Sequence, residues 1–128
     1  MKNFLHKKNI FRIFFLKLLI LVNFQCSTNR DRSDYITTYV SYYANKFDGK
    51  KTANGEVYRH HKMTGAHKNL PYGTKIEIIN IKNSKSVIIT INDRGPLKSS
   101  RELDISQAAF KKLGSLNEGI LKVKYRKL

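Results

Sequence analysis

Four side chains that can exchange protons stand at loops or strand ends of this sequence: Glu56, His67, Asp93 and Asp104. Each alone has a structural explanation. In the same order, these are a solvated turn residue, a residue that braces a loop by hydrogen bonds, a turn former and an anion at a helix start. Together they meet the needs of glycosidic bond cleavage. That reaction requires a carboxylic acid to protonate the leaving oxygen and a group to stabilise positive charge on the sugar ring.

Aromatic side chains lie in the same segments and could stack on sugar faces. They are Tyr42, Tyr43, Phe47, Tyr58 and Tyr72. Packing in a hydrophobic core is the alternative, and we expect it to account for at least half of them.

Short strands and long loops must position these groups. Aromatic and β-branched residues predict a strand over 35–43, and two further runs predict a hairpin over 74–81 and 86–91. Residues 44–73 carry turn signals too dense for a long regular element. Pro96 cannot donate to a ladder, so the hairpin ends just before it and leaves Asp93 at a strand end.

The C-terminal part predicts one helix and one strand. Ser106 can cap a short helix that stops at Gly114. Leu121, Val123 and Tyr125 alternate with cations, as in a half-buried strand. The predicted fold is therefore mainly β, a small barrel with one or two short helices.

The composition indicates one small folded domain of strong positive charge. The 128 residues are 41% hydrophobic and 27% charged, with a net charge of +16. Without Lys2, Lys7, Lys8, Arg12 and Lys17, 20 basic and 9 acidic residues remain, a net charge of +11. Such charge attracts nucleic acid, anionic lipid or cell-wall polymer alike. The cations form no single stripe, so we expect no nucleic-acid partner.

The sequence predicts no metal and no other cofactor. Cys26 is the sole cysteine, which excludes an intramolecular disulfide and a cysteine-rich zinc site within one chain. His60 and His61 are adjacent and point apart in an extended chain, so they are poor joint ligands.

The N-terminus has the pattern of an export signal. A basic segment at 1–8 precedes an apolar stretch at 13–22 that is too short to span a bilayer. A buried amphipathic helix is the alternative. We expect a signal peptide at 1–25, a polar tether at 26–34 and the folded domain at 35–128.

Cys26 follows the apolar run at the distance of the acylated cysteine in lipoproteins, so we expect it to be lipidated. The protein would then be exported to the cell envelope and anchored to a membrane, facing the periplasm. A soluble secreted form and an uncleaved anchored form are the alternatives.

Linked motifs extend from residue 39 to residue 125. One covers 47–56 (Phe-Asp-Gly-Lys-Lys-Thr-Ala-Asn-Gly-Glu), and another covers 64–74 (Thr-Gly-Ala-His-Lys-Asn-Leu-Pro-Tyr-Gly-Thr). Asn-Asp-Arg-Gly-Pro at 92–96 and Leu-Asp-Ile-Ser at 103–106 follow. In order and spacing these motifs resemble the rare lipoprotein A (RlpA) family. Gly65 and Glu102 depart from it, since alanine and an apolar residue are usual there.

The resemblance implies a six-stranded double-psi β-barrel, related to expansins and to septal-ring lytic transglycosylases. It implies Asp93 as the catalytic acid and His67 as a second catalytic position. The residues expected to bind substrate are Glu56, Tyr43, Asn54, Arg94 and Asp104.

The implied reaction cleaves the bond between MurNAc and GlcNAc in peptidoglycan. The sugar's own C6 hydroxyl attacks the anomeric carbon and leaves a 1,6-anhydro-MurNAc end, so no water nucleophile is needed. Asp93 would give a proton to the glycosidic oxygen and later take one from the C6 hydroxyl. The expected partners are glycan strands and, through the lipid, a membrane. We expect a monomer.

Two other classes of function fit the sequence. A non-catalytic envelope lipoprotein that binds glycan would keep the groove but tolerate loss of Asp93. A charge-driven binder of nucleic acid or membrane would show affinity that falls steeply with salt. The export signal argues against nucleic acid.

Overall fold

The structure, a computed structural model, describes residues 34–128. The expected signal peptide and Cys26 lie outside the described residues. Within residues 34–128, no helix has both the length and the hydrophobicity needed to cross a bilayer.

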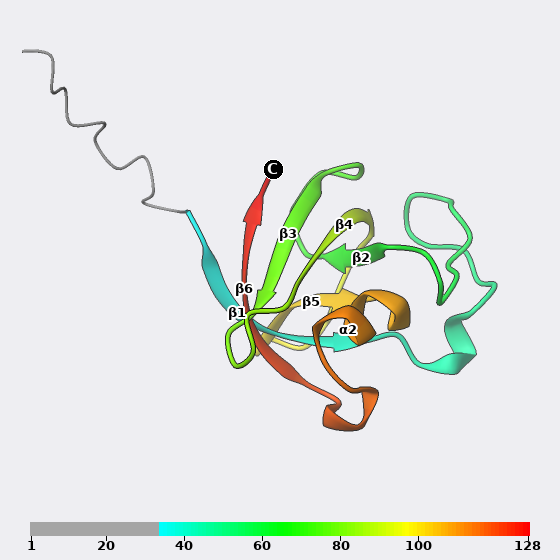
Figure 1. Cartoon of the computed structure of the whole chain (residues 1–128). Coiled ribbons are helices and arrows are strands. Elements are labelled where there is room, and N and C mark those ends of the chain that lie inside the picture. Colours follow the sequence, from blue (N-terminus) through cyan, green and yellow to red (C-terminus); the bar gives the residue numbers. More distant parts are fainter. Residues whose placement is uncertain (1–33) are drawn as a thin grey trace, which may run out of the picture. The chain divides into compact units, whose positions relative to one another are not determined.

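Six strands close into a barrel in the order β1-β5-β2-β4-β3-β6 (Figure 1). The strands are β1 (Ile36–Tyr42), β2 (Thr64–His67), β3 (Lys75–Asn80), β4 (Ser86–Asp93), β5 (Arg101–Ile105) and β6 (Leu121–Lys127). The pairs β1/β5 and β2/β4 are parallel, and the other four neighbouring pairs are antiparallel. The predicted six-stranded, mainly β barrel is confirmed.

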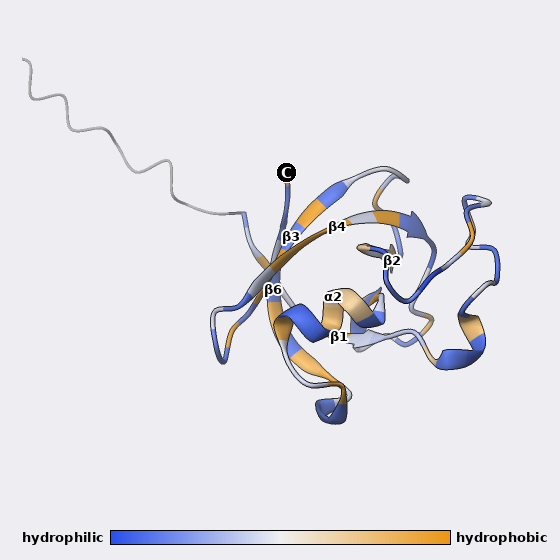
Figure 2. Ribbon diagram, turned by 45° about the vertical axis from the view of Figure 1, so that its right-hand side comes forward, coloured by the Kyte–Doolittle hydropathy of each residue, from blue (hydrophilic) through white to orange (hydrophobic). Residues whose placement is uncertain are grey.

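Alternation of side chains along the strands builds the core. Ile76 and Ile78 of β3 are fully buried, as is Val123 of β6, while the residues between them are more exposed. Figure 2 shows the same alternation of hydrophobic and hydrophilic residues along β3 and β6. Such a pattern places one face of each strand inside the barrel.

Three short helical segments complete the described part: η1 (Asn45–Phe47), α2 (Gln107–Leu113) and η2 (Leu116–Glu118). The side chain of Ser106 caps α2 by accepting a hydrogen bond from the backbone N–H of Ala109 at 3.1 Å. Phe110 and Leu113 on α2 are fully buried and belong to the core cluster. The helix thus packs against the barrel core. Its predicted cap at Ser106 and its predicted end at Gly114 are confirmed.

The segment 44–73, predicted to hold no long regular element, contains the four-residue strand β2, which was not predicted. The strand β5 was also not predicted as a separate element. Both are short, and Thr-Gly-Ala-His has little β-branched or aromatic character, so local propensity is weak. Pairing with distant strands, not local preference, makes them strands.

The backbone at Gly65 lies against two neighbouring strands. A Cβ atom there would lie 2.9 Å from the backbone oxygen of Asp104 and 2.7 Å from Cδ1 of Ile89. The backbone oxygen is held in the β2–β5 pairing, so it cannot move aside without disturbing the ladder. Gly65 therefore allows the close approach of β2 to its neighbours.

We expect Gly65→Ala to lower the free energy of unfolding by about 3 kcal/mol, as overpacking of a tight interior does. Urea denaturation followed by circular dichroism measures the change. Gly119→Ala is the control, since a Cβ atom there has no neighbour within 4 Å and only a φ of 70° opposes it. That control should lose about 1 kcal/mol. A smaller loss for Gly65→Ala than for the control would contradict the steric explanation.

Candidate active site

The strand register places two aspartates on either side of one alanine. Ala66 of β2 pairs with Asp93 of β4 on one side and with Asp104 of β5 on the other. Residues paired across neighbouring strands share a face of the sheet, and strands are about 4.8 Å apart. The two aspartates are therefore about 10 Å apart at Cα and face the same side, with a methyl group between them.

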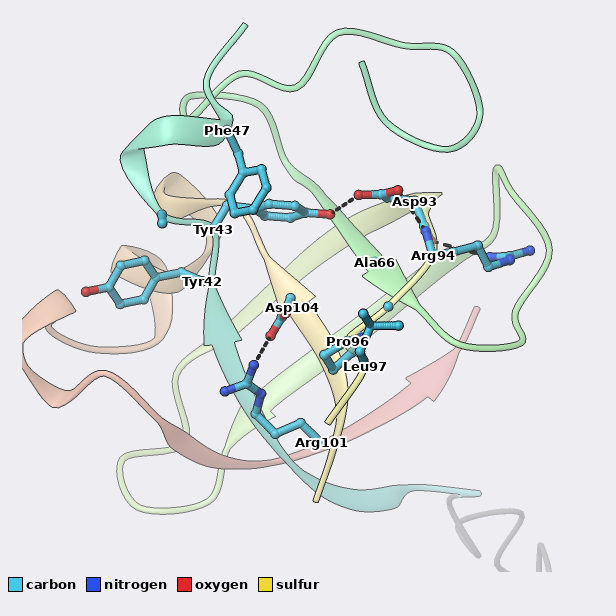
Figure 3. A pocket seen from close by; sticks show the side chains of 12 residues that line it. Tyr42, Tyr43, Phe47, Ala66, Asp93, Arg94, Pro96, Leu97, Arg101 and Asp104 are labelled. Carbon is cyan, nitrogen blue, oxygen red and sulfur yellow. Dashed lines mark hydrogen bonds and ion pairs between the residues drawn. The ribbon is translucent and has the colours of Figure 1, made fainter. Parts of the chain in front are cut away.

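These residues form part of a surface pocket of about 420 Å³ (Figure 3). In Figure 3, Asp93 lies near Tyr43 and Phe47, and Asp104 lies below with Arg101. The lining residues are Tyr42, Tyr43, Ala44, Phe47, Ala66, Asp93, Arg94, Gly95, Pro96, Leu97, Arg101 and Asp104. The predicted site residues Asp93, Asp104, Arg94 and Tyr43 thus come together.

Three donors fix the Asp93 carboxylate. Oδ2 accepts a hydrogen bond from the hydroxyl of Tyr43 at 2.7 Å. Oδ1 accepts from the backbone N–H groups of Ala53 at 2.8 Å and Arg94 at 2.9 Å. Hydrogen bonds to a carboxylate stabilise its charged form and hold it in one orientation.

The side chain of Tyr43 is itself held by aromatic packing. Its ring stacks on that of Tyr58 with centroids 4.3 Å apart and meets the ring of Phe47 edge-on at 5.9 Å. Burial, followed by the hydrogen bond to Asp93, raises the pKa of Tyr43. The phenol therefore stays protonated and acts as a donor to Asp93.

Asp104 has a different environment. Nη2 of Arg101 lies 3.2 Å from Oδ1 of Asp104 in an ion pair, but the contact lacks hydrogen-bond geometry. Within residues 34–128, Asp104 Oδ1 and Arg101 Nε are buried without a hydrogen-bond partner. Burial raises the pKa of the Asp104 carboxyl, and this outweighs the lowering by Arg101 and Lys98. The pocket therefore presents two carboxyl groups in different environments, one held by three hydrogen bonds and one buried beside a cation.

The rim of the pocket is apolar and aromatic. Leu97 and Phe47 are exposed although both are hydrophobic. The Arg94 guanidinium lies 4.0 Å from the centroid of the Tyr72 ring, a cation–π contact that fixes both side chains. A second hollow of about 400 Å³ shares Tyr42 and Ala44 with the pocket, so the two hollows are adjacent on the surface.

Glu56 and Asn54 lie beside the pocket and are not among its lining residues. Both belong to a turn that docks on the end of β4: the Asn54 N–H donates to the Asn92 carbonyl at 3.3 Å, and Asn92 Nδ2 donates to Glu56 Oε2 at 3.0 Å. The bond from Asn92 is the main cause that lowers the pKa of Glu56, which therefore stays charged. This turn places the Ala53 N–H within hydrogen-bond distance of Asp93.

His67 lies on the other face of β2. It follows Ala66 directly, and successive strand residues point to opposite faces, so its ring points into the barrel and is 6% exposed. Its Nε2 is 3.0 Å from the hydroxyl of Tyr125. The structure therefore separates His67 from the two aspartates, although it is adjacent in sequence to a pocket residue.

Arg101 and Leu97 line the pocket and were not predicted as site residues. Arg101 precedes Asp104 by three residues, a spacing that gave no signal because β5 was not predicted. Nothing in the sequence marks Leu97. Among the described residues, no group of three or more His, Cys, Asp or Glu side chains is placed to hold a metal ion.

The fold and the pocket together define the class of protein: a small β-barrel protein with two aspartates in one open surface pocket. A family model described as Lytic transglycolase matches residues 35–125. The chain belongs to this family.

Two curated relatives are similar over the barrel. The "Probable endolytic peptidoglycan transglycosylase RlpA" of Treponema pallidum is 47% identical over 89 residues, which cover 70% of this chain and 28% of that protein. The "Endolytic peptidoglycan transglycosylase RlpA" of Pseudomonas aeruginosa is 50% identical over 84 residues, 66% of this chain and 25% of that protein. The matched part thus spans about a quarter of the length of these relatives.

Among solved structures, a mutant expansin of Clavibacter michiganensis in complex with cellohexaose is similar in fold. It superposes with a TM-score of 0.58 at 18% sequence identity, covering 73% of this chain and 50% of that one. The family match and such neighbours confirm the predicted double-psi β-barrel.

Proposed function

We propose that this protein acts in the cell envelope as a lytic transglycosylase that cleaves the MurNAc–GlcNAc bond and leaves 1,6-anhydro-MurNAc ends. The placement of Asp93 and Asp104 on either side of Ala66 is the observation that carries the proposal. The names of the two relatives agree with it.

The two carboxyl groups divide the proton transfers in this proposal, which differs from the expectation from sequence that Asp93 carries out both. Asp104, whose burial favours the neutral acid, gives its proton to the glycosidic oxygen as the bond breaks. Asp93, oriented by three donors, stabilises the positive ring and takes the proton of the C6 hydroxyl as that oxygen attacks the anomeric carbon. Proton exchange with solvent then restores both groups, so no cofactor is required.

The pocket suits a linear polysaccharide. The adjacent hollow beyond Tyr42 and Ala44 offers room for a further sugar unit, and exposed Phe47 supplies an apolar face for stacking. Arg94, fixed on Tyr72, supplies donors to sugar oxygens. The complex of the expansin with cellohexaose supports a glycan strand as the ligand of this fold.

Glu56 and Asn54 remain proposed binding residues at the edge of this groove. Glu56 is exposed and charged, so its second carboxylate oxygen can accept from sugar hydroxyls. Their shared turn also orients Asp93 through the Ala53 N–H. A monomer remains our prediction for the oligomeric state.

Incubation of the purified protein with peptidoglycan tests the function. Mass spectrometry should detect anhydromuropeptides that increase with time. Binding of glycan without any release would favour the non-catalytic glycan-binding lipoprotein. Binding that depends on charge alone would weaken steeply as salt rises and would not distinguish glycan from other polyanions.

We expect Cys26 to carry the lipid that anchors the protein in the envelope. Metabolic labelling of the full chain with a fatty acid should mark the parent protein, and Cys26→Ser should remove the label, because no other cysteine is present. Labelling of the variant at the level of the parent would show that the lipid is attached elsewhere.

A further inference from the structure

We propose that His67 positions the pocket wall and takes no part in proton transfer. It does so through a hydrogen-bonded chain that runs from Glu102 through Tyr125 to His67. The proposal rests on the proposed function only for its activity measurement, because the state of the His67 ring can be observed directly.

The direction of each hydrogen bond follows from its donors. Nδ1 of His67 lies 2.9 Å from the backbone nitrogens of Asn69 and of Leu70, and both N–H groups point at it. Because both are donors, Nδ1 must be the acceptor and carries no proton. In the neutral ring the proton is therefore on Nε2.

The chain continues from Nε2 to a carboxylate. Nε2–H donates to the hydroxyl oxygen of Tyr125 at 3.0 Å, and the Tyr125 hydroxyl donates to Oε2 of Glu102 at 2.7 Å. Every donor on this path has an acceptor, and the path ends on an anion. Glu102 can reach Tyr125 because it is the extra residue of a bulge, where β1 residues Tyr39 and Val40 pair with Arg101 and Leu103.

The other side of His67 holds the pocket wall. Its carbonyl oxygen accepts a hydrogen bond from Nη1 of Arg94 at 3.2 Å, and Arg94 lines the pocket. Its ring fixes the backbone of Asn69 and Leu70, which leads to Tyr72 under the Arg94 guanidinium. His67 thus holds Arg94 through its backbone carbonyl, and its imidazole holds the turn that leads to Tyr72.

Protonation of His67 would break this arrangement, because a proton on Nδ1 would face two N–H donors. The charged groups around the ring act in opposite directions: Glu102 on β5 favours the cation, while Arg94 and Lys68 oppose it. Tyr125 on β6 is neutral at ordinary pH, since burial raises its pKa. Burial of the imidazole is the largest effect and lowers the pKa of His67. The brace therefore persists through the neutral range.

Long-range ¹H–¹⁵N correlation NMR of the folded protein reads the ring directly. We expect a neutral His67 with its proton on Nε2 at pH 7, and the same form as the main one at pH 6.5, the usual histidine pKa. A ring with its proton on Nδ1, or an imidazolium at pH 7, would overturn the proposal whether or not the protein cleaves peptidoglycan.

Activity measurements on Tyr125→Phe separate positioning from proton transfer. The variant removes the acceptor of Nε2–H, so we expect KM to rise roughly 3- to 10-fold, the effect of one hydrogen bond, while the pH profile of kcat keeps its shape. Glu102→Gln should show a smaller change in the same direction. Tyr39→Phe, a substitution at a 46% exposed ring, is the control and should leave both readouts unchanged.

Two outcomes would overturn the positioning role in this assay. One is a Tyr125→Phe variant, folded by circular dichroism, in which an ionisation disappears from the pH profile of kcat. The other is unchanged kinetics together with an unchanged His67 ring in the NMR spectrum. A parent protein without any activity would reject the proposed function, and the NMR measurement would still decide the state of His67.

Discussion

Asp93→Asn should release anhydromuropeptides roughly 10²–10⁴ times more slowly than the parent protein, the usual contribution of acid–base catalysis. The substitution removes the charge and the ability to take a proton. It keeps the shape: the amide oxygen can accept from the N–H groups of Ala53 and Arg94, and the amide nitrogen can donate to the Tyr43 hydroxyl oxygen. Folding and glycan binding should therefore survive.

The measurement is the initial rate of anhydro-product release, with circular dichroism and a glycan pull-down to verify folding and binding. Asp48→Asn is a matched control. Asp48 also accepts a backbone hydrogen bond, from His60 at 3.1 Å, but it does not line the pocket. Equal rates for Asp93→Asn and the parent would exclude Asp93 as the residue on which cleavage depends.

Local sequence patterns were sufficient to predict three of the strands and the start of the helix. The predicted strands at 35–43 and 74–81 correspond to β1 and β3 within one residue at each end, and Ser106 caps its helix as expected. The third predicted strand, 86–91, extends in the structure to Asp93 as β4. These elements carry β-branched and aromatic residues or a capping side chain, so short-range chemistry determines them.

The site depended on strands that local chemistry does not determine. Only the pairing of β2 with both β4 and β5 brings Asp93, Ala66 and Asp104 together. The same pairing turns the His67 ring toward the inside of the barrel. The motif at 64–74 identified this histidine as a candidate but could not show where its ring points. Sequence alone therefore suggested the acidic residues but not which of them share a pocket.

The environments of the two aspartates were equally beyond the sequence. Burial raises the pKa of Asp104 despite the Arg101 ion pair, which lowers it. Burial of a strand residue depends on its neighbours in space, and those neighbours come from β1 and β2. The proposed division of the proton transfers between the two carboxyl groups therefore depends on tertiary structure.

Asp104→Asn should also lower the rate roughly 10²–10⁴-fold, because it removes the group proposed to donate the first proton. The parent's rate should fall as the pH rises through the raised pKa of Asp104, since deprotonated Asp104 has no proton to give. In the residual activity of Asp104→Asn, this alkaline decline should be absent. Rates measured across the pH range on folded protein test both points.

Arg101→Gln gives the sharper version of this test. The Arg101 cation lowers the pKa of Asp104, so its removal should raise that pKa further, and a carboxyl with a higher pKa keeps its proton to a higher pH. The alkaline decline in rate should therefore move to higher pH in Arg101→Gln, whatever happens to the maximum rate. Arg59→Gln, at an ion pair with Asp48 outside the pocket, should leave the decline in place. A decline that does not move in Arg101→Gln would assign the first proton to a group other than Asp104.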